Sequence, residues 1–579
     1  MAEKLTHSLR LALGQLNFTV GDINGNTAKI IANIALARDQ GADLAIFPEL
    51  AITGYPPEDL LLKRDFVEEN IKAIRQIASA TEGITAIVGF VDVNKDIYNA
   101  AAVLHNGRIV GVHRKFFLPN YGVFDEDRYF QAGTETQVYA LEEVIFGVEI
   151  CEDAWYADGP HMMQALVGGA HLIVDINSSP FYAGKWIFRE QMLSTRAADN
   201  SCAFVYLNTV GGQDELVFDG HSLVIGPSGE VIFRGKAFEE QLAIVDLDLS
   251  AVEHRRLVDP RRRKAKLAAS GKVNIPQTTL EPVRKVQRNG ESTQSAQPPK
   301  QLEEIYSALV LGTKDYVNKN GFREVVLGLS GGIDSALTTV IACDALGPER
   351  VRVLIMPSEY SSEATQSDAE TIARNLGIKH DRIIITDIFH AYLDALKNIF
   401  EGTESGVAEE NIQARIRGNL LMALSNKFGA LVLTTGNKSE MACGYSTLYG
   451  DMAGGFAVIK DVPKTLVYKL ANYRNSLGEV IPESVIKRAP SAELKPGQVD
   501  QDTLPPYDIL DPIIEAYVQE DRSVKEIVAL GFDEETVRRV VRMIDRNEYK
   551  RRQAPPGIKI TPKAFGRDRR LPITNRYHE

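Results

Sequence analysis

The chain has 579 residues, of which 44% are apolar and 25% are charged, a composition typical of folded proteins with packed cores. Because a single core stops growing at about 250–300 residues, we expect at least two domains. The net charge of −12 argues against a nucleic-acid partner, and no apolar run reaches the roughly 18 residues that a membrane-spanning helix needs.

The N-terminal residues and the cysteines indicate the cellular compartment. The first residues, MAEKLTHSLRLALGQLN, lack the apolar block of a signal peptide. None of the four cysteines lies in a C-x-x-C pair, which argues against a disulfide framework and against a zinc site: Cys151, Cys202, Cys343 and Cys443. We therefore expect a cytoplasmic protein with no nucleic-acid and no membrane partner.

The first half alternates strand-like and helix-like segments. Helical spacing of apolar residues predicts a helix over 26–41, and turn residues predict hairpins over 101–113 and 222–235. Apolar runs predict strands at 9–17, 42–50, 85–93, 144–153, 170–179 and 202–210. This mixture predicts a layered α/β domain with a mixed sheet.

A change in composition separates the two halves. Residues 276–300 contain four prolines and almost no apolar periodicity. We therefore expect one domain over 1–260, a linker over 261–300 and a second domain over 301–579.

The second half begins with a predicted helix at 301 and returns to strands after each helix. Strands are predicted at 326–329, 351–358, 381–388 and 430–440, with helices at 362–377 and 409–427 between them. Strands that return after helices are typical of a parallel sheet.

The stretch SGGIDS, residues 330–335, lies where a strand turns into a helix. Backbone N–H groups of Gly331 and Gly332 and the helix N-terminus can bind phosphate oxygens, and Ser330 and Ser335 can donate to them. Asp334 beside an anion makes sense as a Mg²⁺ ligand, since a cation would then lie between the two negative charges. The alternative is a tight turn that an aspartate caps.

SGGIDS resembles the signature of the ATP pyrophosphatases, which cleave ATP between its α- and β-phosphates and adenylate an acceptor. Segments 410–427, 431–465 and 488–511 are similar to the NAD synthetase family within that group, and the resemblance covers residues 301–579. It implies a parallel-sheet α/β domain that binds ATP and Mg²⁺ and amidates nicotinic acid adenine dinucleotide (deamido-NAD).

The resemblance also implies roles for individual residues. Asp334 and Glu440 would bind Mg²⁺. The ATP site would contain Gly328, Ser330, Gly331, Gly332, Asp334, Ser335, Thr435, Lys464 and Ser491, and the deamido-NAD site Asn411, Arg415, Glu440 and Lys550. The loop STLYGD, residues 446–451, lacks the lysine of ammonia-only members and agrees better with the glutamine-dependent branch.

Lys550 lies in a basic stretch, because Arg538 to Arg570 includes 12 lysines and arginines against three acids. A solvated basic tail and a phosphate-binding surface both explain such a stretch. The family match at Lys550 favours phosphate binding.

Three reactive side chains end separate elements of the first half. Glu49 follows the strand LAIF, Lys115 follows a hairpin and Cys151 ends the strand GVEI. A glutamate can accept the thiol proton, a cysteine can attack an amide carbonyl, and a lysine ammonium can favour the thiolate and the developing oxyanion. Taken singly, the cysteine could be a buried filler and the lysine a surface charge.

Together with the surrounding residues, these three resemble the nitrilase/amidase superfamily over residues 5–260. That resemblance implies an αββα sandwich, with Glu126 as a second glutamate that supports catalysis. In the glutaminase branch, glutamine would be bound by Tyr121, Ser179 and Lys185.

The two halves joined resemble the glutamine-dependent NAD synthetases, in which the first domain supplies ammonia to the second. The resemblance implies a homo-oligomer, a dimer or an octamer, that pairs through the synthetase domains. Another amidotransferase, with a different acid as acceptor, is the nearest alternative. A tRNA-modifying enzyme and a non-enzymatic docking module are two further alternatives.

Overall fold

The computed structural model describes residues 8–269, 271, 273–282, 288, 290–495 and 497–577. The chain divides into two compact units. Unit 1 comprises Met1–Gln213 and Phe218–Pro299, and unit 2 comprises Asp214–Val217 and Lys300–Glu579. In the described part of the chain, no helix has the length and the hydropathy that crossing a membrane would require.

Unit 1 contains two mixed sheets. The six-stranded sheet has the order β14-β1-β2-β3-β4-β5 and the seven-stranded sheet the order β13-β12-β9-β8-β7-β6-β15. The first is formed by β1 (Ser8–Gln15), β2 (Leu44–Ile46), β3 (Thr85–Asn94), β4 (Asp96–His105), β5 (Arg108–Arg114) and β14 (Gln241–Asp248). The second is formed by β6 (Val138–Leu141), β7 (Val144–Ile150), β8 (Leu172–Asn177), β9 (Ala203–Asn208), β12 (Leu223–Ile225), β13 (Val231–Arg234) and β15 (Gln277–Leu280).

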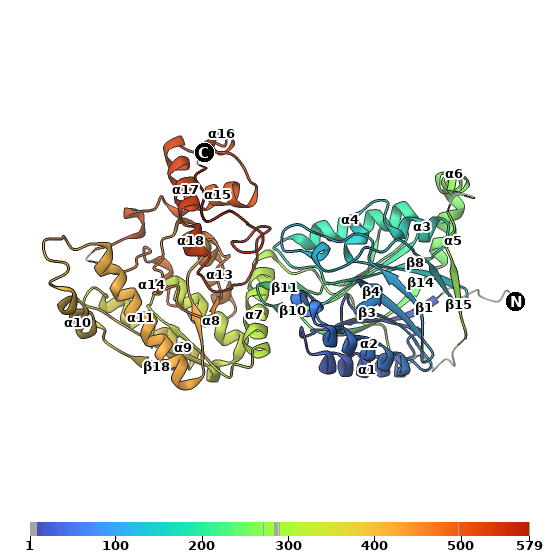
Figure 1. Ribbon diagram of the computed structural model, residues 1–579, viewed down its shortest axis with the longest axis horizontal. Helices are drawn as coiled ribbons and strands as arrows, with labels where there is room; N and C mark the ends of the chain where they lie inside the picture. The colour runs from blue at the N-terminus through green and yellow to red at the C-terminus, as the bar shows by residue number, and fades with distance from the viewer. Residues whose placement is uncertain are drawn as a thin grey trace. The chain divides into compact units, whose positions relative to one another are not determined.

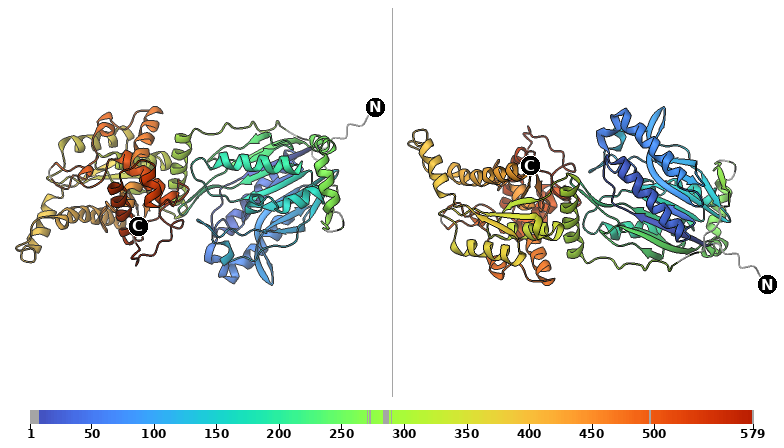
Figure 2. Two further views of the ribbon diagram at one scale, coloured as in Figure 1. Left: turned by 90° about the horizontal axis from the view of Figure 1, so that it is seen from above. Right: turned by 90° about the horizontal axis from the view of Figure 1, so that it is seen from below.

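Helices cover the outer face of each sheet of unit 1. Figure 1 shows α1 (Ile23–Asp39) and α2 (Arg64–Ser79) below one sheet, and α3 (Pro160–Leu166) and α4 (Lys185–Asn200) above the other. The views from above and below in Figure 2 show these same pairs in front of their sheets. The predicted αββα sandwich is therefore confirmed. The chain also forms α5 (Ser250–Val258), α6 (Pro260–Ala269), β10 (Val210–Gln213) and β11 (Leu216–Asp219).

The pleat of each strand sorts its side chains between two cores. Along β1, Leu11 and Leu13 enter the core between the sheets, while Ala12 enters the core beneath α1 and α2. On β8, Val174 faces the inner core and Ile173 faces α3 and α4. Since successive side chains of a strand point to opposite faces, strands buried on both faces read as continuous apolar runs.

We expected residues 261–300 to be a linker, and the described residues of 261–299 belong to unit 1. Strand β15 pairs in parallel with β6 over Gln277 to Leu280. The amide N–H of Thr293 donates to the carbonyl of Ile244 at 2.7 Å. Because polar residues can pair as an edge strand without apolar periodicity, composition alone did not reveal this strand. Residues 270, 272, 283–287 and 289 of this segment lie outside the described residues.

Unit 2 is built on a five-stranded parallel sheet with the order β18-β17-β16-β19-β20. Its strands are β16 (Val325–Gly328), β17 (Val351–Ile355), β18 (Lys379–Arg382), β19 (Leu431–Thr434) and β20 (Phe456–Ala457). Its helices are α7 (Gln301–Lys319), α8 (Ile333–Leu346), α9 (Glu363–Leu376), α10 (Thr386–Leu396), α11 (Val407–Phe428), α12 (Lys438–Cys443), α13 (Lys464–Ser476), α14 (Glu483–Lys487), α15 (Tyr507–Ile514), α16 (Val524–Ala529), α17 (Glu534–Arg546) and α18 (Glu548–Arg551). The predicted parallel sheet is confirmed.

The strand predicted over 381–388 is misplaced. Strand β18 ends at Arg382, and α10 already begins at Thr386. The amides of Ile383 and Ile385 still donate to the carbonyls of Ile355 and Pro357, so this segment stays beside β17 between strand and helix. The apolar residues 383–385 are compatible with a strand and with a helix, so the sequence did not show where the strand ends and the helix begins.

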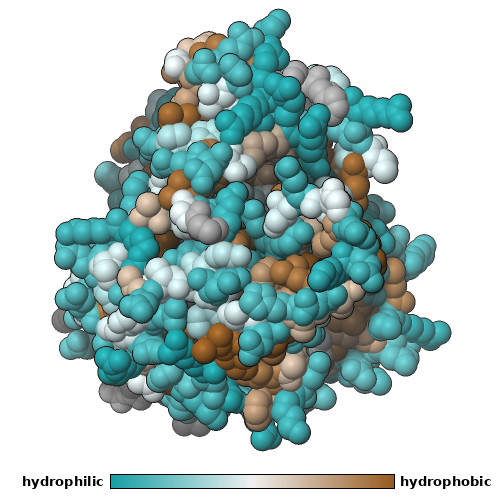
Figure 3. Space-filling model, turned by 90° about the vertical axis from the view of Figure 1, so that its left-hand side faces the viewer, coloured by the Kyte–Doolittle hydropathy of each residue, from teal (hydrophilic) through white to brown (hydrophobic). Residues whose placement is uncertain are grey.

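One face of unit 2 exposes apolar side chains between hydrophilic ones (Figure 3). In residues 384–428, large apolar side chains at least half exposed are Ile384, Ile399, Val407 and Phe428.

Candidate functional site

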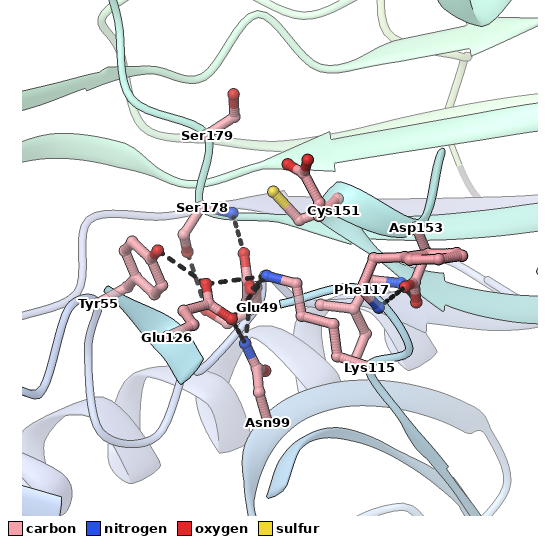
Figure 4. Close-up of polar contacts among 12 residues, drawn as sticks. Glu49, Tyr55, Asn99, Lys115, Phe117, Glu126, Cys151, Asp153, Ser178 and Ser179 are labelled. Atoms are coloured by element: carbon pink, nitrogen blue, oxygen red, sulfur yellow. Dashed lines mark hydrogen bonds and ion pairs between the residues drawn. The ribbon is translucent and has the colours of Figure 1, made fainter. Parts of the chain in front are cut away.

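The three reactive residues of unit 1 meet although they come from distant parts of the chain. Glu49 follows β2, Lys115 follows β5, and Cys151 follows β7 at the start of a short 3₁₀ turn, η3 (Cys151–Trp155). Figure 4 shows their side chains directed toward a common point. All three are nearly inaccessible to solvent, and Glu126, from the 3₁₀ turn η2 (Glu126–Arg128), lies beside them.

The Lys115 ammonium is held between two carboxylates. Its Nζ donates to Oε1 of Glu49 at 2.7 Å and to both carboxylate oxygens of Glu126 at 2.9 Å. Burial alone would lower the pKa of Lys115, but the charges of Glu126 and Glu49 outweigh it and raise this pKa well above its usual range. The lysine therefore stays charged in the core of unit 1.

Further polar groups fix the two glutamates (Figure 4). Asn99 donates to Glu49 at 2.7 Å, and the backbone N–H of Ser178 donates to the other oxygen of Glu49 at 2.8 Å. The hydroxyl of Tyr55 donates to Glu126 at 2.9 Å. Burial is the main cause that raises the pKa of Glu126 to about 7, against the opposing charge of Lys115.

The Cys151 thiol is neutral in this arrangement. Burial and the neighbouring carboxylate of Glu49 raise the pKa of Cys151 well above its usual range, although Lys115 acts in the opposite direction. Lys115 favours the thiolate, as we expected, but burial and the charge of Glu49 outweigh its effect on the thiol pKa. Cysteine attack therefore requires that a base remove the proton. Among the neighbouring charges, that of Glu49 acts most strongly on the thiol.

The three residues predicted to bind glutamine are placed around the cysteine turn. Lys185, the first residue of α4, donates to Oγ of Ser179 at 2.9 Å and to the carbonyl of Pro180 at 2.7 Å. The half-exposed Tyr121 donates its hydroxyl to Glu152 at 3.0 Å, so it reaches a residue of the same turn as Cys151.

In unit 2 the SGGIDS turn lines a pocket of about 300 Å³. Gly331 has a φ of +84°, and a Cβ there would lie 2.1 Å from the carbonyl oxygen of Thr365, so only glycine fits. Ser330 and Ser335 bond each other at 3.0 Å through their hydroxyl oxygens. Every residue predicted for the ATP site lines this pocket: Gly328, Ser330, Gly331, Gly332, Asp334, Ser335, Thr435, Lys464 and Ser491.

Asp334 and Glu440 gather around Lys464. The Lys464 ammonium forms an ion pair with Asp334 and lies 3.7 Å from Glu440, while Asn437 donates to Asp334 at 2.9 Å. Burial raises the pKa of Glu440 to about 8, and the charge of Asp334 adds to this shift. Two carboxylates that repel each other are hard oxygen ligands that suit a divalent cation with substrate phosphates.

The other residues predicted for deamido-NAD collect around a loop that follows α12 and do not line the pocket described above. Nζ of Lys550 donates to the carbonyls of Gly444 and Ser446, at 2.7 and 2.9 Å. Asn411 accepts from Thr447 at 2.7 Å, and Arg415 donates to the carbonyl of Leu448 at 3.2 Å. Lys550 is half-buried, so it is not part of a solvated tail.

Several residues of both sites were absent from the sequence prediction. In unit 1 these include Tyr55, Asn99, Glu152 and Ser178, and in unit 2 they include Arg417, Asn437 and Asp500. Burial lowers the pKa of Arg417 to about 10, and its Nε donates to the carbonyl of Met356 at 3.1 Å. Of these residues, Glu152 could have been predicted from the sequence, because it directly follows Cys151.

Two family models match the chain, one on each half. The carbon-nitrogen hydrolase model matches residues 10–256, and the NAD synthase model matches residues 305–554. These matches agree with the sites described in unit 1 and unit 2.

Full-length relatives are also similar. The glutamine-dependent NAD(+) synthetase of Thermotoga maritima is 52% identical over 576 residues, which is 99% of each chain. That of Aquifex aeolicus is 50% identical over 98% of this chain and all of its own. The solved glutamine-dependent NAD+ synthetase of Acinetobacter baumannii, in complex with ADP, has a TM-score of 0.74 and 44% identity, and the match covers 98% of this chain and 99% of that one. The chain therefore belongs to the glutamine-dependent NAD(+) synthetase family.

Proposed function

We propose that this chain converts deamido-NAD to NAD with ATP and with ammonia that it releases from glutamine. AMP, pyrophosphate and glutamate are the other products, and the reaction is the final step of NAD biosynthesis. The observation that carries the proposal is the convergence of Glu49, Lys115 and Cys151 in a chain whose other unit holds a phosphate-type turn.

In unit 1, Glu49 takes the thiol proton as Sγ of Cys151 attacks the amide carbonyl of glutamine. The proton passes to the leaving nitrogen, the C–N bond breaks, and a thioester and ammonia result. Water then hydrolyses the thioester, which releases glutamate and restores the thiol. The Lys115 ammonium lies where it can stabilise the oxyanion, and Glu126 keeps that ammonium in place. Tyr121, Ser179 and Lys185 bind glutamine.

In unit 2, a carboxylate oxygen of deamido-NAD attacks the α-phosphorus of ATP, and pyrophosphate leaves. Ammonia then attacks the acyl carbon of the adenylate, and AMP leaves with the former carboxylate oxygen. The pocket residues from Gly328 to Ser335, with Thr435, Lys464 and Ser491, bind ATP, whereas Asn411, Arg415, Glu440 and Lys550 contact the dinucleotide.

Asp334 and Glu440 would hold a divalent cation, which we take to be Mg²⁺ because ATP phosphates would complete its oxygen ligands. The ion would neutralise charge on the phosphates and on the leaving pyrophosphate. Lys464, already beside both carboxylates, would contribute a second positive charge at the phosphates.

The proposal also includes the organisation of the enzyme. The glutaminase would occupy residues 1–260 with support from the segment 261–300, and the synthetase residues 301–579. The exposed apolar side chains of residues 384–428 support a homo-oligomer, a dimer or an octamer, that assembles through the synthetase units. The cytoplasm, where ATP and glutamine are both available, is the compartment we assign.

Isotope exchange between ATP and pyrophosphate tests the acceptor of the synthetase unit. Exchange should require deamido-NAD, because only a carboxylate that attacks ATP makes adenylation reversible. Xanthylate and aspartate should give only background exchange. Equal stimulation by either of these acids would contradict the proposed acceptor.

Cys151→Ala should abolish glutamine-dependent synthesis and leave synthesis from high ammonium within about twofold of wild type. The thioester forms only in unit 1, and adenylation does not use the thiol. Steady-state NAD formation with each nitrogen donor measures both activities. Cys202→Ala is the matched control, since Cys202 is another buried cysteine of unit 1, and it should keep both activities. Loss of both activities in a folded Cys151→Ala protein would disprove the two-site assignment.

Asp334→Asn should lower synthesis from both glutamine and ammonium by about tenfold to a hundredfold at ordinary magnesium concentrations. The amide keeps the shape of the side chain but removes the charge that we assign to the cation. Initial rates measured over a magnesium titration report the effect. Asp344→Asn, on the same helix but paired with Arg474, is the control and should keep normal activity. Wild-type rates in Asp334→Asn would mean that Asp334 only caps the turn.

A further inference from the structure

Asp153 is a buried carboxylate two residues beyond Cys151. Its side chain has no exposed surface. Its Oδ1 accepts hydrogen bonds from the backbone N–H groups of Phe116 and Phe117, each at 2.9 Å. Its Oδ2 accepts from the backbone N–H of Ile150 at 3.2 Å and from Nε2 of His113 at 3.3 Å.

The donors belong to the two segments that carry the catalytic lysine and cysteine. Phe116 and Phe117 directly follow Lys115, and Ile150 directly precedes Cys151. Figure 4 shows the bond from Phe117 to Asp153 on the opposite side of Lys115 from Glu126. One carboxylate therefore ties the end of β5 to the end of β7.

The cysteine turn needs such a tie because its backbone is strained. Cys151 has a φ of +49°, a left-handed conformation that residues with a side chain rarely adopt. The N–H of Cys151 donates to Oδ1 of Asp175 at 2.7 Å, so a second buried carboxylate holds the same turn from the adjacent strand.

We propose that Asp153 is a positioning residue of the glutaminase, which fixes the Lys115 ammonium relative to the Cys151 sulfur. This inference rests on the proposed glutaminase activity and deepens it. Asp153 touches neither sulfur nor ammonium through any of its four bonds, so it acts through the backbone on either side. Its loss should therefore slow the covalent step, kcat, more than it weakens glutamine binding, KM.

Asp153→Asn is the variant that tests the proposal. The amide keeps the volume and one acceptor oxygen for Phe116 and Phe117, but its NH₂ then faces the N–H of Ile150 and the imidazole N–H of His113. Glutaminase kcat should fall at least about tenfold, with KM and ammonia-dependent synthesis within about twofold of wild type. The rate at which iodoacetamide alkylates Cys151 should also reach half its maximum at a different pH, because Lys115 shifts relative to the thiol.

The control is Asp246→Asn, a carboxylate of unit 1 that bonds Arg10 and Ser292 near the start of β1, away from the catalytic strand ends. It should change neither kcat nor the alkylation profile. A folded Asp153→Asn protein with wild-type kcat and an unchanged alkylation profile would overturn the proposal, even if its melting temperature falls.

A second variant covers the case in which Asp153→Asn does not fold. His113→Phe keeps a ring against Phe116 and removes only one of the four donors. It should lower glutaminase kcat by about threefold with an unchanged KM; an unchanged kcat would overturn the proposal. Failure of the underlying function is distinguishable, because glutamine-dependent synthesis would then survive in Cys151→Ala.

Discussion

A buried lysine between two carboxylates is the constraint on which both sites depend. Lys115 lies between Glu49 and Glu126 in unit 1, and Lys464 lies beside Asp334 and Glu440 in unit 2. A lone buried ammonium or carboxylate would lose its charge, since removing either from water is costly. Each carboxylate pair therefore keeps its lysine charged, and each lysine opposes the effect of burial, which raises the pKa of Glu126 and of Glu440.

This balance sets the chemistry of the cysteine. Because Lys115 is neutralised by its partners, little of its charge remains to stabilise a thiolate, and burial raises the pKa of Cys151. The free enzyme then holds a protonated thiol that is protected from adventitious oxidation and alkylation, which require the thiolate. Bound glutamine would supply the carbonyl whose developing negative charge draws on Lys115 as Glu49 takes the proton.

The sequence predicted much of this arrangement because Glu49, Lys115, Cys151 and the SGGIDS turn all follow the ends of strands. It could not predict the side chains of Tyr55 and Asn99 or the backbone N–H of Ser178, which meet the glutamates only after strands distant in sequence pair. The neutral thiol was missed because it depends on how many carboxylates surround Lys115. The pairing of β15 with β6 was missed because a polar edge strand has no apolar periodicity.

The rate at which iodoacetamide alkylates Cys151, followed against pH without glutamine, tests the charge balance most directly. Mass spectrometry of the Cys151 peptide would give the rate in the otherwise intact protein. Since burial and Glu49 raise the thiol pKa, the rate should still be rising above pH 8.5, about the midpoint of an ordinary cysteine. A rate that reaches its plateau below pH 7 would show a stable thiolate and contradict this view of the site.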